Sequence, residues 1–222
     1  SESEEVGWPW GEEVEVVERF TYLGSDVHAN ASSYSEVIRR LGRACGVMDS
    51  LDNGVWRCRH LCKRTKIRVF GSLVLPVLLY GCETWTLNKD LRYRVNSFGT
   101  SALRRICGHR WYDFVSNQRL LEDTGMRPIT CLIRERQLRL FGHVARFPVS
   151  DPAYQVLFTE DPEDWRRPVG RPYTTWSQQV GRYFSEMGMD WESARGTAKD
   201  DPVRYRQLVN AATRCSGACP HT

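Results

Sequence analysis

The most apolar segment of the chain lies near its middle and reads Val69-Phe70-Gly71-Ser72-Leu73-Val74-Leu75-Pro76-Val77-Leu78-Leu79-Tyr80. A membrane-spanning helix needs about 20 apolar residues in succession, and Gly71, Ser72 and Pro76 interrupt this run. We therefore expect the segment to form the centre of a protein core. The basic residues before it are compatible with a helix, so the sequence predicts one helix over residues 59–80 that is kinked or broken near Pro76.

Amphipathic patterns on both sides of this segment predict a mainly α-helical fold. A first helix should begin at a capping box formed by Ser33 and Glu36 and bury an apolar face that includes Cys45. Asp201 is expected to cap the last helix. Alternation of apolar and polar residues over residues 14–23 predicts a strand, which is followed by a turn at Gly24. Further helices are expected over residues 89–107, 117–124, 128–147, 173–187, 191–199 and 202–214, with a proline-rich loop over residues 148–172.

Charge is distributed unevenly along the 222 residues, of which 41% are apolar, a composition typical of a globular protein. The first nineteen residues contain seven Glu and one Arg, whereas residues 36–146 contain twenty-one Lys or Arg and nine Asp or Glu, a net charge of +12. Arginine outnumbers lysine twenty-seven to four, and its planar guanidinium suits phosphate and stacks on bases. The basic middle therefore favours nucleic acid as a partner, and the alternative is a solvated charged surface.

Three groups of basic residues are the candidate nucleic-acid contacts. The first lies on the solvent faces of two predicted helices that could flank a duplex, and it comprises Arg39, Arg43, Lys63 and Lys66. The second shares one helix face with Arg136 through three- and four-residue spacings, and it comprises Arg139, His143 and Arg146. The third projects from a stiff proline-containing loop, and it comprises Arg166, Arg167 and Arg171. A solvated face is the alternative for the second group, and a linker that packs Trp176 on the core is the alternative for the third.

The eight cysteines raise the question of a metal site. Cys58 and Cys62, together with Cys215 and Cys219, could bind zinc. Their spacings differ from the common zinc knuckle, and the first pair could instead pack on one helix face. The sequence shows no signal peptide, so we expect reduced thiols and a nuclear and cytoplasmic location rather than secretion. No phosphate-binding loop or nucleophile motif is present in the sequence, and we assign no catalytic residue.

Several short motifs resemble blocks of the LINE-type reverse transcriptases of non-LTR retrotransposons, and the likeness is greatest to the RTE-like branch. The blocks occur in the family's order and span roughly residues 14–210. They are Phe20-Thr21-Tyr22-Leu23-Gly24-Ser25, then Leu78-Leu79-Tyr80-Gly81-Cys82-Glu83-Thr84-Trp85, then Leu103-Arg104-Arg105-Ile106 with Trp111, then Gln137-Leu138-Arg139 with Gly142-His143-Val144 and Arg146, and finally Arg167-Pro168 with Gly170-Arg171-Pro172 and Trp176.

The resemblance implies the C-terminal part of such an enzyme. Its expected divisions are the end of the palm with a primer-grip hairpin (1–30), a thumb-like helical bundle (31–110), a helical connector (111–147), a Pro/Arg-rich loop (148–172) and a C-terminal helical region (173–222). The expected fold class is thus mainly α, with a short N-terminal β-hairpin before a multi-helix bundle and a second helical region. The primer-grip-like residues are Tyr22, Leu23, Gly24 and Ser25.

The resemblance also implies that the chain binds RNA and DNA, as a template–primer hybrid or as element RNA, and no membrane. The family's palm aspartates, which hold the catalytic magnesium ions of the full-length enzyme, are absent from this sequence. We therefore expect no polymerase activity from this chain alone, no cofactor of its own, and a functional dependence on the palm domain of the same polyprotein. Two alternatives are a domesticated scaffold that binds a protein and a small zinc-binding nucleic-acid module.

Overall fold

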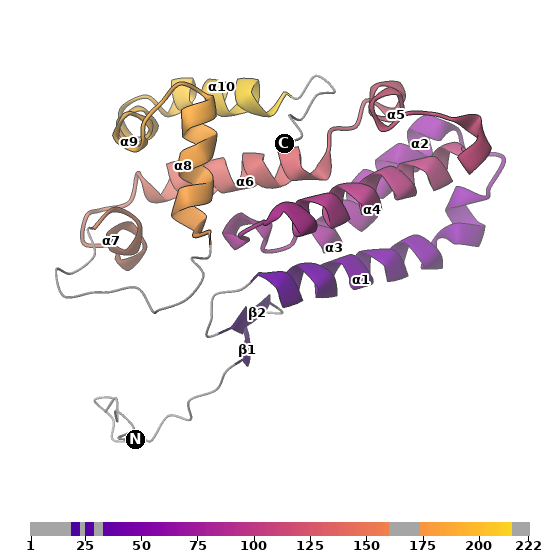
Figure 1. Ribbon diagram of the computed structural model, residues 1–222, viewed down its shortest axis with the longest axis horizontal. Coiled ribbons are helices and arrows are strands. Elements are labelled where there is room, and N and C mark those ends of the chain that lie inside the picture. The colour runs from indigo at the N-terminus through magenta and orange to yellow at the C-terminus, as the bar shows by residue number, and fades with distance from the viewer. Residues whose placement is uncertain (1–18, 23–24, 29–32, 160–173, 215–222) are drawn as a thin grey trace.

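A computed structural model describes residues 19–22, 25–28, 33–159 and 174–214 (Figure 1). The described part is mainly α-helical, which confirms the predicted class. Two four-residue strands, β1 (Arg19–Tyr22) and β2 (Ser25–His28), pair antiparallel before the first helix. Every helix in the described ranges falls short of the length and apolarity that a membrane-spanning helix requires.

One group of helices packs around the apolar segment. Figure 1 shows α1, α3 and α4 lying close together on the same side of the molecule. The helices of this group are α1 (Tyr34–Ser50), α2 (Lys63–Val69), α3 (Leu75–Leu78), α4 (Lys89–Cys107) and α5 (Asn117–Thr124), with π-helical turns η1 (Asp52–Trp56) and η2 (Phe70–Val74) and 3-10 turns η3 (Cys82–Thr84) and η4 (Trp111–Asp113).

The apolar segment forms a helix with a π-helical turn in its middle. The backbone is helical from α2 through η2 to α3, and the π-helical turn ends just before Pro76. A wider turn accommodates a proline, which has no N–H to donate, so the predicted irregularity near Pro76 is confirmed. The helix begins at Lys63 rather than at residue 59, because the preceding chain is held elsewhere. Trp56 Nε1 donates to the carbonyl of Met48 at 2.7 Å, and Lys66 Nζ donates to the carbonyl of Trp56 at 2.7 Å.

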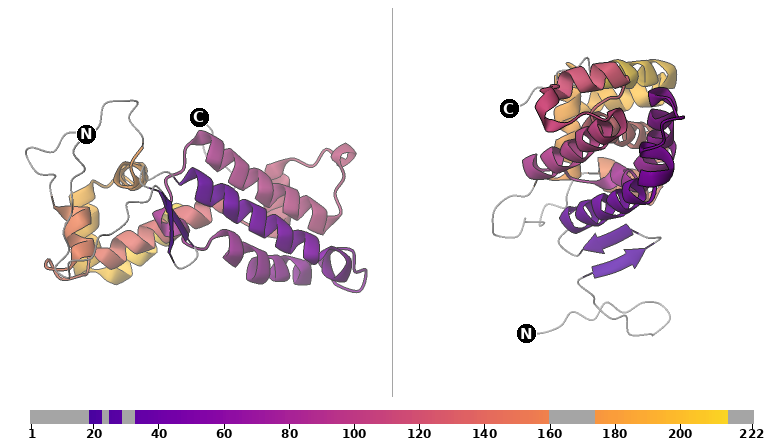
Figure 2. Two further views of the ribbon diagram at one scale, coloured as in Figure 1. Left: turned by 90° about the horizontal axis from the view of Figure 1, so that it is seen from below. Right: turned by 90° about the vertical axis from the view of Figure 1, so that its right-hand side faces the viewer.

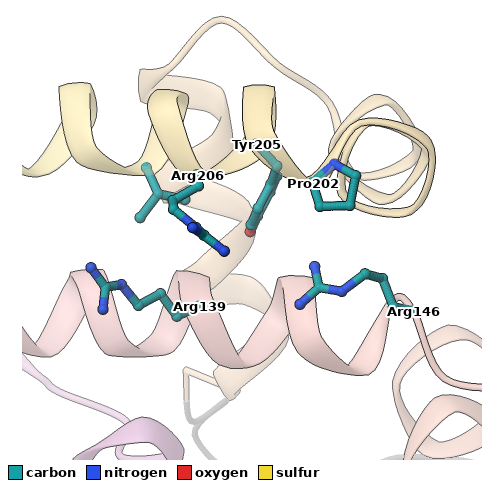
Figure 3. A pocket seen from close by; sticks show the side chains of 6 residues that line it. Arg139, Arg146, Pro202, Tyr205 and Arg206 are labelled. Atoms are coloured by element: carbon teal, nitrogen blue, oxygen red, sulfur yellow. The ribbon is translucent and has the colours of Figure 1, made fainter.

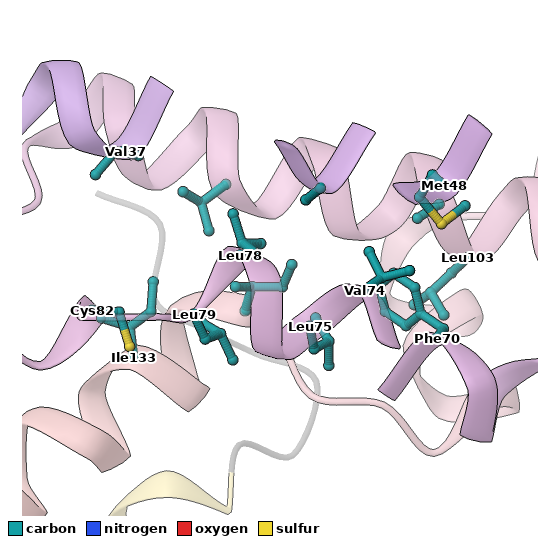
Figure 4. Packing of buried hydrophobic residues seen from close by; sticks show 14 of the residues in the cluster. Val37, Met48, Phe70, Val74, Leu75, Leu78, Leu79, Cys82, Leu103 and Ile133 are labelled. Atoms are coloured by element: carbon teal, nitrogen blue, oxygen red, sulfur yellow. The ribbon is translucent and has the colours of Figure 1, made fainter. Parts of the chain in front are cut away.

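The core of this group lies between the helical segment α2–η2–α3 and its two long neighbours, α1 and α4 (Figure 4). Phe70, Val74 and Leu78 are at most 1% exposed, and they pack with Val37 of α1 and Leu103 of α4. Each such side chain stabilises the fold by about 1.5–3 kcal/mol through burial. One face of the segment predicted to be central is therefore central, whereas its other face, which includes Leu73, is exposed.

A second group gathers around the C-terminal half of α6. Its helices are α6 (Ile129–Val144), α7 (Pro152–Phe158), α8 (Trp176–Glu186), α9 (Trp191–Asp200) and α10 (Pro202–Thr213). Phe141 of α6 is the centre of this second core. Its ring lies 4.7 Å from that of Phe184, 4.7 Å from that of Trp191 and 5.5 Å from that of Phe158, all edge to face, a favourable arrangement for aromatic rings.

Helix α6 belongs to both cores and joins them, and the left view of Figure 2 shows it running from one group of helices to the other. Ile133 packs in the first core and Leu138 in the second. Between them, Gln137 is fully buried and its amide donates to the carbonyl of Trp85 at 2.6 Å. Gln179 of α8 donates to Gln137 Oε1 at 2.9 Å and accepts from the backbone N–H of Leu87 at 2.7 Å. This buried amide pair satisfies loop groups that would otherwise be left unpaired.

Two expectations about α1 are wrong. The Ser33 hydroxyl does not cap the helix but accepts a hydrogen bond from the backbone N–H of Thr86 at 2.9 Å. Cys45 is exposed, whereas Glu36 and Arg40 are buried and joined by an ion pair of 2.7 Å. The guanidinium of Arg40 also lies 4.4 Å from the centre of the Tyr80 ring. A paired charge that stacks on an aromatic ring can be buried, and this shifts the buried face of α1 away from Cys45.

The predicted loop over residues 148–172 contains a helix, so that expectation is also wrong in part. Helix α7 occupies Pro152–Phe158, and Asp151 caps it by accepting from the N–H of Ala153 at 2.8 Å. Proline is compatible with the first turn of a helix, so Pro152 begins this helix and does not prevent it. The predicted cap of α10 is confirmed, because Asp201 accepts from the N–H of Arg204 at 2.9 Å.

Candidate nucleic-acid interface

Helix α2 and the residues before it form the most basic described surface, which we call the α2 surface and define as Arg59, Lys63, Arg64 and Arg68. All four side chains are exposed. Residues 59–68 contain five basic residues and no acidic one. Within the described ranges, these four side chains form no hydrogen bond or ion pair, whereas arginines elsewhere pair with carboxylates, as Arg94 does with Asp90 at 2.7 Å. The α2 surface therefore keeps its full positive charge toward solvent.

Of the four basic residues that the sequence predicts as nucleic-acid contacts on α1 and α2, two are exposed and two make contacts within the protein. Arg43 and Lys63 are exposed, as expected. Arg39 is not on a solvent face, because its side chain is only 20% exposed and its guanidinium binds the carboxylate of Glu36. Lys66 is partly buried and donates to the carbonyl of Trp56. Two of the four predicted contacts thus stabilise the fold.

Sequence reasoning left Arg64 and Arg68 out of the candidate site, although they stand in the same basic run. The signal that identifies them is the absence of any carboxylate from residues 59–68. A basic residue without an acidic neighbour on its own helix has no intrahelical ion pair to form.

The basic residues predicted to share one face of α6 also differ in their surroundings. Arg136 turns toward the first core, where its guanidinium donates to the carbonyl of Leu79 at 2.9 Å and lies 3.3 Å from a Glu83 carboxylate oxygen. His143 is exposed, and its ring lies 4.7 Å from the ring of Phe147. Arg139 and Arg146 remain exposed on the side of α6 that faces α10 (Figure 3).

A groove between α6 and α10 holds these two arginines and a third that the sequence did not suggest. The cavity measures about 430 Å³. It is lined by Arg139, Arg146, Pro202, Tyr205, Arg206 and Val209, which we call the α6–α10 groove. Arg206 lies more than sixty positions from Arg139, and no periodic pattern links the two helices.

The close approach of α6 and α10 beside this groove depends on Gly142. A β-carbon at this position would lie 2.4 Å from Cε1 of Tyr205. Tyr205 is only 4% exposed, and its hydroxyl donates to the carbonyl of Leu138 at 2.7 Å. Burial raises the pKa of the Tyr205 phenol, so this group is a neutral donor at ordinary pH.

The remaining predicted sites fall largely outside the described residues. Arg166, Arg167 and Arg171, Leu23 and Gly24 of the primer-grip-like segment, and Cys215 and Cys219 all lie there, so these assignments stay predictions. Cys58 and Cys62 do not share a helix face as the packing alternative required, because residues 57–62 are not helical. No group of three or more possible metal ligands occurs among the described residues. Cys131 is disulfide-bonded, which departs from the expectation of reduced thiols, whereas Cys45, Cys58, Cys62, Cys82 and Cys107 are free.

Comparison with known proteins indicates the class of this chain, which is transposon-related in origin. Its sequence is 30% identical over 181 residues to an uncharacterized transposon-derived protein of Caenorhabditis elegans. The aligned region covers 79% of this chain and 63% of the relative, so the chain spans a little less than two thirds of that protein. No family model matches the sequence. No solved structure matches it either.

Proposed function

We propose that this chain is the thumb and C-terminal region of a LINE-type reverse transcriptase of the RTE-like branch, and that it binds nucleic acid through the α2 surface. The observation that carries the proposal is the exposed group Lys63, Arg64 and Arg68 on α2, which forms no hydrogen bond or ion pair within the described ranges, in a molecule that pairs many of its other arginines with carboxylates. The family motifs support this origin, and the transposon-derived relative supports a transposon-related one.

The chemistry of the α2 surface suits a phosphate backbone better than base edges. Arg64 and Arg68 are four residues apart on one helix face, with Lys63 beside them. Guanidinium groups bind phosphate oxygens with two parallel hydrogen bonds, and such contacts are independent of sequence. An RNA–DNA hybrid presents its phosphates and 2′-hydroxyls beside a shallow minor groove, where recognition depends on shape and charge. We therefore propose that the α2 surface holds a template–primer hybrid or folded element RNA.

In the full-length protein, the segment Tyr22–Ser25 would hold the primer end, and the palm domain of the same polyprotein would carry the magnesium ions and the chemistry. Arg166, Arg167 and Arg171 would add phosphate contacts. In this proposal the chain binds and orients the nucleic acid, and it contributes no catalytic residue.

The test is fluorescence-anisotropy binding of a labelled RNA–DNA hybrid over a salt series. The variant is the triple substitution Lys63→Ala, Arg64→Ala and Arg68→Ala. The matched control is Arg94→Ala with Arg119→Ala, because both arginines are exposed on helices but paired with an aspartate four residues away. We expect the triple variant to lower the slope of log affinity against log salt by about 2–3, since each phosphate contact contributes about 0.9, and the control to keep the wild-type slope.

An unchanged slope in a folded triple variant would refute the α2 surface as the interface. Wild-type protein that is folded yet binds no nucleic acid at low salt would refute the proposed function as a whole. That second result would favour the protein-binding scaffold, which a pull-down with the folded chain would then address.

A further inference from the structure

The α6–α10 groove combines positive charge with apolar surface. Arg139 and Arg146 come from α6, and Arg206 reaches toward them from α10 (Figure 3). Pro202 and Val209 supply apolar surface to the same groove. The groove thus combines charged walls with apolar contact area, as sites for amphipathic ligands do.

The charge of the groove is only partly neutralised by the protein. Arg139 lies 2.5 Å from Glu135, but that carboxylate is shared with Arg127 at 2.7 Å. Among the described residues, the side chain of Arg146 donates only to a backbone carbonyl, that of Ala198, at 3.3 Å. Arg206 makes no hydrogen bond or ion pair with any part of the chain that the structure describes. A net positive charge therefore remains in the groove and attracts an anion.

The spacing of the arginines favours an extended anion over a compact one. Arg139 and Arg146 are seven residues apart, which corresponds to about 10.5 Å along the helix axis. One nucleic-acid strand in a duplex carries a phosphate every 3.4 Å or so of axis, so successive phosphates of one strand can occupy both arginines at the same time. A cavity of about 430 Å³ has the size of a small-molecule pocket, which suits one strand and not two.

We propose that the α6–α10 groove binds a single strand of nucleic acid, with its phosphates on Arg139, Arg206 and Arg146 and its sugars or bases on Pro202 and Val209. The inference rests on the proposed function, since it assumes a nucleic-acid-binding protein, but it assigns the strand to a site separate from the α2 surface. Its occupant is unpaired RNA or DNA, the chemical form that a template has before it is copied.

The experiment uses a labelled single-stranded oligothymidylate and, in parallel, the labelled RNA–DNA hybrid. The variant is Arg206→Glu, because Arg206 has no hydrogen bond or ion pair within the described residues whose loss would weaken the fold. The matched control is Arg204→Glu, which makes the same charge change on an exposed residue of the same helix that does not line the groove. We expect Arg206→Glu to weaken single-strand binding by about tenfold or more, as the loss of a charge-assisted hydrogen bond predicts. Arg204→Glu and the triple α2 variant should each change it less than about threefold, because neither contacts the groove.

Three results would overturn the groove assignment. The first is single-strand binding that Arg206→Glu and Arg204→Glu weaken equally. The second is single-strand binding lost in the α2 triple variant and kept in Arg206→Glu, which leaves the proposed function standing. The third is displacement of the oligothymidylate by inorganic pyrophosphate at equal phosphate concentration, which would show a site for a compact phosphate group. Folded protein that binds neither the single strand nor the hybrid refutes both this inference and the proposed function.

Discussion

The substitution Gly142→Ala should destabilise the protein, although alanine is a better helix former than glycine. The added methyl group would lie 2.4 Å from Cε1 and 2.9 Å from Cδ1 of Tyr205. The ring would have to move by about 1 Å to restore ordinary van der Waals distance. It cannot do so freely, because Tyr205 is buried and its hydroxyl is held by the Leu138 carbonyl at 2.7 Å.

The magnitude follows from three contributions. Overpacking of a well-packed contact costs about 1–3 kcal/mol, and stretching the buried hydroxyl's hydrogen bond costs about 1 kcal/mol more. The gain in helix propensity offsets about 1 kcal/mol. We expect a net loss of about 2 kcal/mol, which corresponds to a melting temperature lowered by roughly 4–8 °C for a chain of this size.

The assay is urea unfolding followed by circular dichroism, with Gly42→Ala as the matched control. Gly42 is an exposed position in α1, and a β-carbon there would meet nothing within 4 Å. That control should gain about 0.5–1 kcal/mol of stability from helix propensity alone. A Gly142→Ala protein as stable as Gly42→Ala would refute the close packing of α6 on α10 and with it the shape of the groove.

Two further predictions concern buried polar and thiol groups. Gln179→Leu should lower the free energy of unfolding by about 2–4 kcal/mol, because it leaves the Leu87 N–H and the amide oxygen of Gln137 without a partner that both now have. Gln207→Leu, at an exposed position of α10, is the control for urea unfolding, and equal effects of the two substitutions would contradict the buried pair. Among the cysteines, the Thr65 hydroxyl lowers the pKa of the exposed Cys62 thiol, while burial raises the pKa of Cys82 to about 12. More thiolate is then present on Cys62 than on Cys82 at pH 8, so iodoacetamide should label Cys62 in the folded protein and Cys82 only after unfolding. Mass spectrometry of the labelled peptides measures this. Labelling of Cys82 in the folded protein would contradict its burial.

Local sequence signals located most of the helices because they act within one helix. The predicted helix over residues 89–107 is observed at those bounds, with Gly108 in the left-handed conformation that ends it. The helix over residues 117–124 is likewise observed as predicted. Helix α7 was missed because its proline is compatible with two outcomes, a loop or a first helical turn, and only the cap by Asp151 distinguishes them.

The partners of charged side chains were beyond the reach of the sequence. Periodicity places Arg136 on one face of α6 with Arg139, but it cannot show that the Arg136 guanidinium turns to the carbonyl of Leu79. The same limit applies to Lys66, whose ammonium group closes on the carbonyl of Trp56. An amphipathic pattern reports which face of a helix is apolar, whereas a hydrogen bond depends on where the next element of the chain comes to lie.

The sequence alone determined that this protein is mainly helical, that its core is built on the apolar run before Tyr80, and that residues 36–146 carry an excess of basic residues, most of them arginine. These properties follow from composition and from periods of three and four residues, which a single chain displays without reference to its fold. Only the tertiary structure decided which arginines remain free and that Arg206 faces Arg139 and Arg146 across a groove. The physical reason is that charge density belongs to the chain, whereas a binding surface is formed by residues that distant segments bring within a few ångströms of one another.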